Sequence, residues 1–471
     1  MSSEPGLGGW LRSLHPGYKL VLVAVLGFTL FVGASWATAP PQDPGIADDG
    51  TANASGNWSE YDENATLLGL QGGFRTTDGY ARLISGDPVS GDLVQQWQSR
   101  ESWANFDVSP LSDGRVLTAF IQKGYTDCGE YGPECPRTGF RIYDVENDTI
   151  DREWTFPVDR THNSEVHDVE MLPNGEVLVV DMAGERVFAV DQSGEITWQW
   201  NASERYNPPA DPESRDWLHM NDVDAISEDR YLVSVRNANQ LVILERGEGV
   251  VEVINEDDGS SDDSCTEGPR LVPDADGDVK CGDPGVMREQ HNPQWIGDGY
   301  VLVADSGNDR IVVLRRDDEE WEVFQEYEGV DGTRFNWPRD ADLLENGNIL
   351  VTDTFNSRVV EMTWEGRAVW KAGTGRNPPT IPYEADRLPH GEYAPGVLNG
   401  SVLNATIDGN VSEPPESYDR VEIPGITLLF NTLVGVGVVP IPYWATQWHL
   451  VGLLIALLAS AVGTVWGYRG S

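Results

Sequence analysis

The chain is poor in cysteine, histidine and basic residues, and each shortage narrows the class of protein. Its 471 residues include only 4 cysteines and 7 histidines. Lys and Arg together number 32 against 77 Asp and Glu, which gives a formal net charge of −45. A charge that negative argues against nucleic acid as a partner and suits a halophile surface kept soluble in concentrated salt. The acids are spread along the chain, which argues against an acidic interaction tail.

The few cysteines form two local pairs in loop-like sequence, Cys128 with Cys135 and Cys265 with Cys281. Neither pair has the CxxC spacing that is typical of zinc sites. We therefore expect two loop disulfides in an oxidising compartment. Asparagines that begin N-x-S/T sequons fit a glycosylated surface outside the cell. They are Asn53, Asn57, Asn64, Asn147, Asn201, Asn399, Asn404 and Asn410.

Long apolar runs are confined to the two ends of the chain. Residues 18–39 and 447–468 are each long enough to cross a bilayer. Arg12 and Arg469 flank these runs, so the positive-inside rule places both ends in the cytoplasm and the middle of the chain outside the cell membrane. The first run is either a transmembrane anchor or a signal peptide, because Ala37-Thr38-Ala39 resembles a cleavage site.

The apolar runs divide the chain into segments. Residues 1–17 are expected as a cytoplasmic tail, and residues 40–63, rich in Pro, Gly, Asp and Asn, as a disordered stalk. A repeat region covers 64–373, and a closure segment or linker follows over 374–420. A third apolar run over 421–445 contains an asparagine and two prolines, which favours an interfacial or re-entrant segment over a third crossing.

Helical periodicity is almost absent between the apolar ends, where short β-type runs repeat about every 50 residues. The clearest copies begin at His167, His291 and Arg339, each followed by a turn glycine and a strand-ending aspartate. Four strands joined by tight turns are typical of a β-propeller blade, and we count six blades. The first blade is incomplete and must borrow a strand from beyond Gly373 or before Tyr80. The predicted fold is all-β, a six-bladed β-propeller of four-stranded blades with transmembrane helices at both ends.

Two sets of charged residues in the repeat have a structural explanation. An aspartate and an arginine five positions later recur as Asp181 with Arg186, Asp305 with Arg310 and Asp353 with Arg358. Repetition once per blade indicates a structural ion pair. A second set of acids directly follows the recurrent polar position and points to the opposite strand face. We expect these acids to bind blade backbone amides; they are Asp107, Asp168, Asp222 and Asp340.

The blade that contains His219 departs from this plan. Val235 and Gln240 replace the aspartate and the arginine of the ion pair, and Arg236 directly follows Val235. Asn221 aligns with the recurrent polar position, so His219 is expected two residues earlier on the same strand face. Function is best sought where consistent patterning fails, which singles out this blade.

The first strand of each blade lines the channel of a propeller, so the recurrent residues should converge at one mouth. They are Phe106, His167, Asn221, His291 and Arg339, with His219 and Arg236 beside them. Imidazoles mixed with guanidinium groups suit an oxyanion, and a histidine is available as a nucleophile for a phosphoryl or sulfuryl group. The arginines would repel a metal cation, so neither a metal nor a cofactor is predicted; a metal-dependent hydrolase is a weaker alternative.

Three phrases of the chain resemble the arylsulfotransferase family of nucleotide-independent aryl-sulfate sulfotransferases, which are six-bladed propellers. They are EVHDVEMLPNGEVLVVD, DWLHMNDVDAI with SVRNANQLV, and QHNPQWIGDGYVLVADSGNDR. The resemblance implies that His291, in the QHNPQ motif, accepts the sulfuryl group from a phenolic sulfate ester and passes it to a phenol. It also implies that His167, His219 and Arg236 bind the sulfate and stabilise the transferring group.

The expected protein is thus a sulfotransferase anchored in the cell membrane, with Arg339, Asn221 and Phe106 as further substrate contacts. Its partners are an aryl sulfate donor, a phenolic acceptor and the lipid bilayer. Bacterial members of the family have a separate N-terminal β-domain, where this chain has a stalk and membrane spans, so the oligomeric state stays open. DSGNDRIVVL also resembles NHL-type propellers, which makes a non-catalytic binding propeller at the cell surface the alternative.

Overall fold

The structure is a computed structural model of the whole chain. It describes residues 14–37, 46, 54–72, 78–86, 93–212, 216–257, 271–273, 277, 279–297, 299–318, 320–374, 381–391 and 447–470. These residues fall into two compact units, which are Met1–Gln42 with Asp419–Ser471, and Asp43–Tyr418. The expected apolar segment over 421–445 lies outside the described residues.

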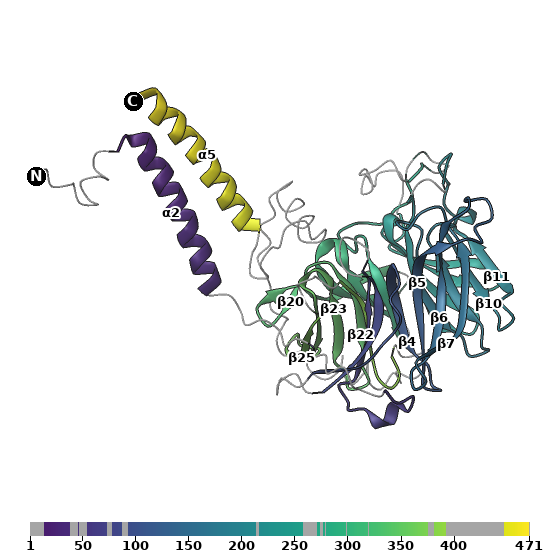
Figure 1. Cartoon of the computed structure of the whole chain (residues 1–471). Coiled ribbons are helices and arrows are strands. Elements are labelled where there is room, and N and C mark those ends of the chain that lie inside the picture. Colours follow the sequence, from purple (N-terminus) through teal and green to yellow (C-terminus); the bar gives the residue numbers. More distant parts are fainter. Residues whose placement is uncertain are drawn as a thin grey trace, which may run out of the picture. The chain divides into compact units, whose positions relative to one another are not determined.

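The larger unit is a six-bladed propeller of four-stranded antiparallel sheets, as the repeat predicts (Figure 1). The second blade comprises β4 (Ala104–Pro110), β5 (Arg115–Tyr125), β6 (Cys135–Asp144) and β7 (Thr149–Pro157). The third comprises β8 (Val166–Met171), β9 (Val177–Asp181), β10 (Arg186–Val190) and β11 (Ile196–Asn201). The fourth comprises β12 (Met220–Ser227), β13 (Arg230–Val235), β14 (Gln240–Glu245) and β15 (Gly249–Ile254).

The fifth blade comprises β16 (His291–Gly297), β17 (Tyr300–Asp305), β18 (Arg310–Asp317) and β19 (Glu320–Tyr327). The sixth comprises β22 (Pro338–Leu343), β23 (Ile349–Asp353), β24 (Arg358–Met362) and β25 (Ala368–Gly373). A short hairpin of β20 (Gly329–Val330) and β21 (Thr333–Arg334) joins these two blades. Short 3-10 turns follow the second strands of the last three blades, η3 (Arg236–Ala238), η4 (Ser306–Asn308) and η5 (Thr354–Asn356).

The first blade is assembled from both ends of the repeat region. Its strand order is β26-β1-β2-β3, with β1 (Thr66–Leu70), β2 (Tyr80–Ser85), β3 (Val94–Gln98) and β26 (Pro382–Arg387). The missing strands therefore come from before Tyr80 and from beyond Gly373, and the ring extends to Arg387. Because β26 pairs with β1, backbone hydrogen bonds join the last part of the ring to the first.

Part of the segment that we expected as a disordered stalk packs on the propeller instead. A 3-10 turn, η1 (Trp58–Glu60), places the Trp58 indole in a hydrophobic cluster with Leu67 and Val116. The indole Nε1 donates to the Leu111 carbonyl over 2.7 Å. Burial of a large aromatic side chain explains why composition alone misjudged residues 54–63, since one tryptophan can offset the polar residues around it.

The innermost strand of every blade is irregular at the recurrent position. The register shifts lie between Asn105 and Val108, Val166 and Val169, Met220 and Asp222, His291 and Gln294, Pro338 and Asp340, and opposite Tyr383 in β26. A bulge turns the side chain of its extra residue away from the ladder. Five of the irregularities thus involve the recurrent residue itself, whereas His291 pairs with Ala304 directly before the irregularity of its strand.

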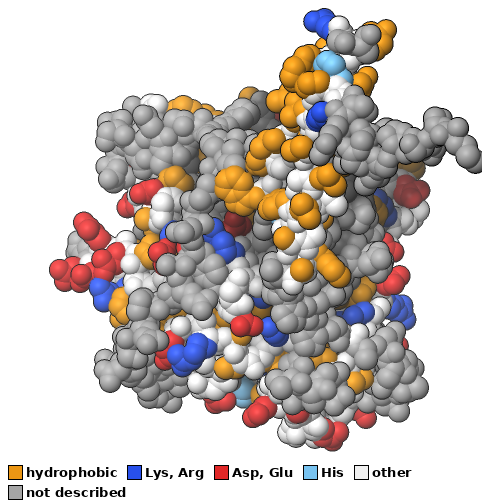
Figure 2. Space-filling model, turned by 90° about the vertical axis from the view of Figure 1, so that its left-hand side faces the viewer, with side chains coloured by type: hydrophobic (Ala, Val, Ile, Leu, Met, Phe, Trp, Pro, Cys, Tyr) orange, Lys and Arg blue, Asp and Glu red, His pale blue; other side chains and the backbone are white. Residues whose placement is uncertain are grey.

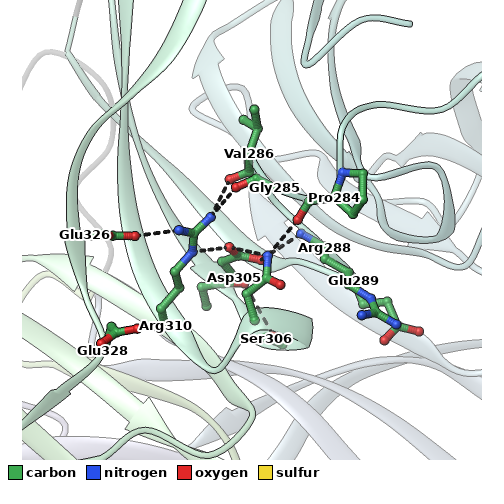
Figure 3. Close-up of polar contacts among 12 residues, drawn as sticks. Pro284, Gly285, Val286, Arg288, Glu289, Asp305, Ser306, Arg310, Glu326 and Glu328 are labelled. Carbon is green, nitrogen blue, oxygen red and sulfur yellow. Dashed lines mark hydrogen bonds and ion pairs between the residues drawn. The ribbon is translucent and has the colours of Figure 1, made fainter. Parts of the chain in front are cut away.

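The repeated ion pairs are confirmed in all three blades. The guanidinium Nε atoms of Arg186, Arg310 and Arg358 lie 2.7, 2.6 and 2.7 Å from the paired carboxylates. Figure 3 shows the pair of the fifth blade, where Arg310 also donates to the carbonyls of Gly285 and Val286. The partner Asp305 accepts the backbone N–H of Arg288 over 2.7 Å. The pair therefore fixes the segment that leads into His291.

Acids of the innermost strands hold neighbouring blades together. Asp107, Asp168 and Asp340 accept backbone N–H groups of Val169, Val223 and Ala385 on the next blade, as expected. A second layer does the same, since Glu170 accepts from Ala225 and Asp224 from Trp295. Two layers of buried carboxylates therefore surround the channel.

The smaller unit consists of two helices, α2 (Pro16–Ala37) and α5 (Gln447–Gly470), both long and apolar enough to cross a membrane. They lie antiparallel, because Gly17 is in close contact with Gly463 while Phe28 lies beside Gly452 (Figure 1). Figure 2 shows apolar side chains gathered along the helix surface, in keeping with the exposure of Leu30. Because α2 lies near the N-terminus, its length and apolar composition also fit a signal sequence.

One of the two expected disulfides is fully described. Cys128 and Cys135 are bonded across the loop between β5 and β6. Cys281 is also disulfide-bonded, whereas Cys265 lies outside the described residues.

Candidate functional site

The innermost strands and their flanking turns enclose a cavity of about 260 Å³. Five of the sequence-predicted residues line it, namely His167, His219, Arg236, His291 and Arg339. The other lining residues are Gln71, Asn163, Glu165, Asp216, Glu289, Trp337 and Tyr383. We call this set the histidine cavity.

Two sequence-predicted residues do not line the histidine cavity. Phe106 is fully buried behind His167, with ring centroids 4.5 Å apart. Asn221 is fully buried and donates to the Gln290 carbonyl over 2.9 Å. Both therefore support the residues of the cavity from behind, and the structure gives neither a direct path to a substrate.

His291 is held through one ring nitrogen. Its Nδ1 lies 2.9 Å from the Ser306 hydroxyl and 3.1 Å from the Glu289 carbonyl. The Ser306 hydroxyl has a single proton, which it donates to the Pro338 carbonyl over 2.5 Å. Both neighbours of Nδ1 then present oxygen lone pairs, so Nδ1 carries the proton. This tautomer leaves Nε2 of His291 as the atom with a free lone pair.

His219 is oriented by a carboxylate and held by a strained turn. Its Nδ1 lies 2.6 Å from Asp216 Oδ1, and its ring centroid lies 5.3 Å from that of His167. Contrary to the expectation of a strand position, His219 precedes β12 with a left-handed φ of 55°. Buried Glu185 holds this turn, because it accepts the N–H groups of Leu218, His219 and Met220. A carboxylate therefore replaces the strand ladder that would otherwise fix the backbone here.

The two arginines enter the cavity from different elements. Arg236 is the first residue of η3, and its Nη2 lies 3.3 Å from Glu289 Oε1. Arg339 is in β22, where its Nη1 donates to Gln71 Oε1 over 2.5 Å. Arg339 forms no ion pair within the described part of the chain, although burial lowers its pKa only to about 10. The charge of Glu165, another cavity residue, favours the Arg339 cation, but burial raises the pKa of Glu165 to about 7, so this negative charge is incomplete at neutral pH.

Positive charge and burial set the protonation of the histidines. Burial comes first, and Arg339 and Arg236 next, among the causes that hold the pKa of His291 well below its usual value. The pKa of His167 is also well below its usual value, because of burial and then the neighbouring His219 and arginines. Both imidazoles are thus neutral at pH 7 and available as lone-pair donors.

Sequence reasoning missed the aromatic walls of the cavity. The Tyr383 ring lies 5.4 Å from that of His167 and 6.0 Å from that of His291. The Arg339 guanidinium carbon lies 4.9 Å from the Tyr383 ring centroid. Trp337 faces His291 from the other side, at 6.2 Å between ring centroids. An anion beside these cations would thus have aromatic surfaces next to it.

The chain is similar to one family model and to several solved structures. Residues 152–313 match the model of the family Arylsulfotransferase (ASST), and this range includes eight of the twelve residues that line the histidine cavity. The chain is 12% identical to a Bacteroides caccae protein of unknown function, with a TM-score of 0.44 over 68% of this chain and 98% of that one. It is 14% identical to the periplasmic gluconolactonase of Pseudomonas aeruginosa, with a TM-score of 0.39 over 73% and 87%.

It is also 10% identical to virginiamycin B lyase of Staphylococcus aureus, with a TM-score of 0.35 over 68% of this chain and 86% of that one. The TM-scores of these solved structures are all below 0.5 and their names differ, so these likenesses assign no function to this chain. The family match extends from within β7 to within β18 and includes His167, His219, Arg236 and His291. That match supports an arylsulfotransferase, in general terms, for this propeller.

Proposed function

We propose that the chain transfers a sulfuryl group from a phenolic sulfate ester to a phenolic acceptor through a sulfohistidine at His291. The observation that carries the proposal is the pairing of a neutral His291 with two arginines in one small cavity. Arg339 donates to the neutral amide of Gln71 and faces Glu165 only as a partly ionised carboxyl, so a sulfate oxyanion would add a full negative charge beside it. The family match over residues 152–313 gives independent support.

The first half-reaction uses the lone pair of His291 Nε2. That atom attacks sulfur, a new N–S bond forms, and the bond from sulfur to the aryl oxygen breaks. Arg236, Arg339 and His167 stabilise the charge on the sulfuryl oxygens as it redistributes. These donors are already fixed by burial and by neighbouring residues, so little reorganisation accompanies the step.

His219 is the group that we assign to protonate the departing phenolate and to deprotonate the acceptor phenol. Its Nδ1–H bonds to Asp216, and that carboxylate stabilises a positive imidazolium on His219. Protonated Nε2 of His219 gives its proton to the departing phenolate. In the second half-reaction the acceptor phenol returns a proton to His219 as its oxygen attacks sulfur and the N–S bond breaks, which regenerates neutral His291.

The size of the histidine cavity favours small aryl groups. Its volume of about 260 Å³ lies below the range that is typical of drug-sized ligands. Trp337 and Tyr383 offer aromatic surfaces beside His291 for a single ring. We therefore propose monocyclic phenols and their sulfates as substrates.

The anchoring of the enzyme is part of the proposal. α2 and α5 would cross the membrane together, and their antiparallel packing keeps the two outer ends on one side. The basic residues Arg12 and Arg469 favour the cytoplasm for that side. The propeller between the helices would then face the outside, where the Cys128–Cys135 disulfide persists.

The test uses the full chain in detergent with 4-nitrophenyl sulfate and phenol. We expect release of nitrophenol, formation of phenyl sulfate, and a peptide containing His291 that is heavier by one sulfuryl group when phenol is omitted. His291→Ala should lower the rate by on the order of 10⁴-fold or more. A folded wild-type chain that releases no phenol from any aryl sulfate would contradict the proposal and favour the binding propeller.

A further inference from the structure

A second set of polar side chains lies one residue further along the innermost strands than the histidine cavity. Read in blade order from the first, the set is Glu384, Asp107, Asp168, Asp222, Asn292 and Asp340. Oxygen atoms of Asp107, Asp168 and Glu384 all lie within 4.8 Å of one another. These three residues come from three neighbouring blades, so the ring of blades itself creates the cluster.

The distances between the carboxyl oxygens of the cluster suit coordination of one cation. Oxygen ligands of Ca²⁺ lie 2.3–2.6 Å from the ion, so two ligands on opposite sides are about 5 Å apart. Three oxygens within 4.8 Å of one another can therefore share one such ion. Without an ion, three acids this close must share protons, as Asp107 and Glu384 do in a side-chain hydrogen bond, because ionised carboxylates would repel one another in a buried site.

Unpartnered oxygens around the cluster are an independent observation. Oδ1 of Asn292, a neutral acceptor at the same position of the repeat, has no hydrogen-bond partner although the residue is only 5% exposed. Asp222 Oδ1 and Asp340 Oδ1 also have no partner, and these residues are 5% and 1% exposed. A buried acceptor without a donor is costly, and a cation with its bound water would satisfy several at once.

The cluster has an access route from the face opposite the histidine cavity. A cavity of about 910 Å³ there is lined by Ser109, Glu170 and Asp224 among others. The Ser109 hydroxyl lies 3.4 Å from Asp107 Oδ1, so the wall of this cavity touches the cluster directly. Glu170 and Asp224 add carboxyl oxygens to the wall of this cavity, between its mouth and the cluster.

We propose that Asp107, Asp168 and Glu384 bind a hard, oxygen-liganded cation of the size of Ca²⁺ in the channel of the propeller. The ion links three blades and counteracts the carboxylate repulsion at the point where β26 closes the ring. Its role is structural, because the histidine cavity lies on the other side of the same strands. The proposal does not depend on sulfotransferase activity.

The experiment treats the full chain with a chelator and then measures bound metal after dialysis against CaCl₂, MgCl₂ or NaCl alone. We expect one equivalent of calcium at about 1 mM free ion, and a higher thermal midpoint with calcium than with sodium. Asp107→Asn should lower the calcium affinity by about tenfold or more, since it removes one carboxylate but keeps an acceptor for Val169.

Two further variants keep the result interpretable. Asp168→Asn serves if Asp107→Asn does not fold, because Asp168 is the least buried member of the cluster. Asp317→Asn with Asp318→Asn, on an exposed acidic turn, is the matched control and should bind calcium like wild type. Absence of bound calcium in the wild type, or a calcium affinity in both cluster variants equal to that of the wild type, would overturn the proposal.

Discussion

The fourth and fifth blades have the same four-stranded plan but carry different residues at equivalent positions. In the fifth blade Asp305 pairs with Arg310 directly across the ladder. In the fourth blade the same ladder position joins Val235 to Gln240, and the Gln240 amide oxygen accepts a hydrogen bond of 2.7 Å from the Tyr206 hydroxyl. A neutral contact thus replaces the ion pair in the blade that supplies Arg236 and His219 to the cavity.

The residue that follows Val235 in the fourth blade, and its equivalents in the fifth and sixth blades, show the consequence of replacing the ion pair. It begins a 3-10 turn in each of the last three blades, as Arg236, Ser306 and Thr354. Arg236 reaches the histidine cavity, whereas Ser306 contacts His291. With an aspartate at Val235, Arg236 would have a carboxylate beside it that competes with a bound anion. Arg236 therefore has Glu289 beside it at 3.3 Å but no second carboxylate from the preceding ladder position.

The largest effect is expected on the stability of the protein, when the buried ion pair of the fifth blade is removed. Asp305→Ala leaves Arg310 without its buried partner, and the Arg288 N–H without an acceptor. Removing one partner of a buried pair costs about 3–5 kcal/mol, so we expect that loss in the free energy of unfolding. Chemical denaturation measures it.

The matched control removes an exposed pair. Asp113→Ala breaks the contact with Arg115, whose side chains are 54% and 35% exposed. We expect less than about 1 kcal/mol for this change. Equal losses for the two variants would contradict the structural role of the buried pair.

Arg236→Gln probes the irregular blade itself. It should lower kcat by about 10²–10³-fold, as expected for the loss of one donor to a charge that develops in the transition state. Arg236→Lys should restore part of the rate, because it restores the charge without the paired donors. Steady-state rates with 4-nitrophenyl sulfate measure both.

Arg230→Gln is the control for this variant, because Arg230 lies in the same blade with a side chain that is 39% exposed. Its rate should equal that of the wild type. If Arg236→Gln also retained the wild-type rate, the irregular blade would not be an adaptation for anion binding.

Ser306→Ala should have a smaller effect. It removes one of the two oxygens at His291 Nδ1, and the Glu289 carbonyl remains to hold the proton there. A hydrogen bond contributes about 0.5–1.5 kcal/mol, so we expect a fall in kcat of up to about tenfold with KM unchanged. Thr354→Ala, at the same turn position of the sixth blade, should leave both constants as they are.

The repeat explains which parts were predictable from the sequence. Residues that occupy a fixed place in each blade, such as His167, His291 and Arg339, were placed together correctly, because a propeller brings equivalent positions to one axis. Tyr383 follows the same rule, since Tyr383-Glu384-Ala385-Asp386 repeats the pattern of Arg339-Asp340-Ala341-Asp342. Its strand was missed because a segment rich in proline separates it from the other blades.

Residues between blades were beyond prediction for a different reason. Asp216, which orients His219, and Glu289, which contacts Arg236, stand in connections that share no register with the repeat. Their positions follow from how each connection folds over the channel, and so does the left-handed backbone of His219. A sequence repeat predicts the strands and turns that recur in every blade. It does not predict the structure of connecting segments that occur only once.

The smallest expected effect concerns the pH dependence that the two arginines impose on His291. Arg339, Arg236, His219 and His167 all lower the pKa of His291 beyond the effect of burial, so the neutral nucleophile persists below pH 6.5 and activity falls only at lower pH. Arg339→Gln removes one of these charges, which raises the pKa of His291. The acid limb of its rate profile should then move to higher pH, by up to about one unit. Profiles of kcat normalised to their maxima measure the shift, and a limb that stays in place would mean that His291 is not the group that titrates.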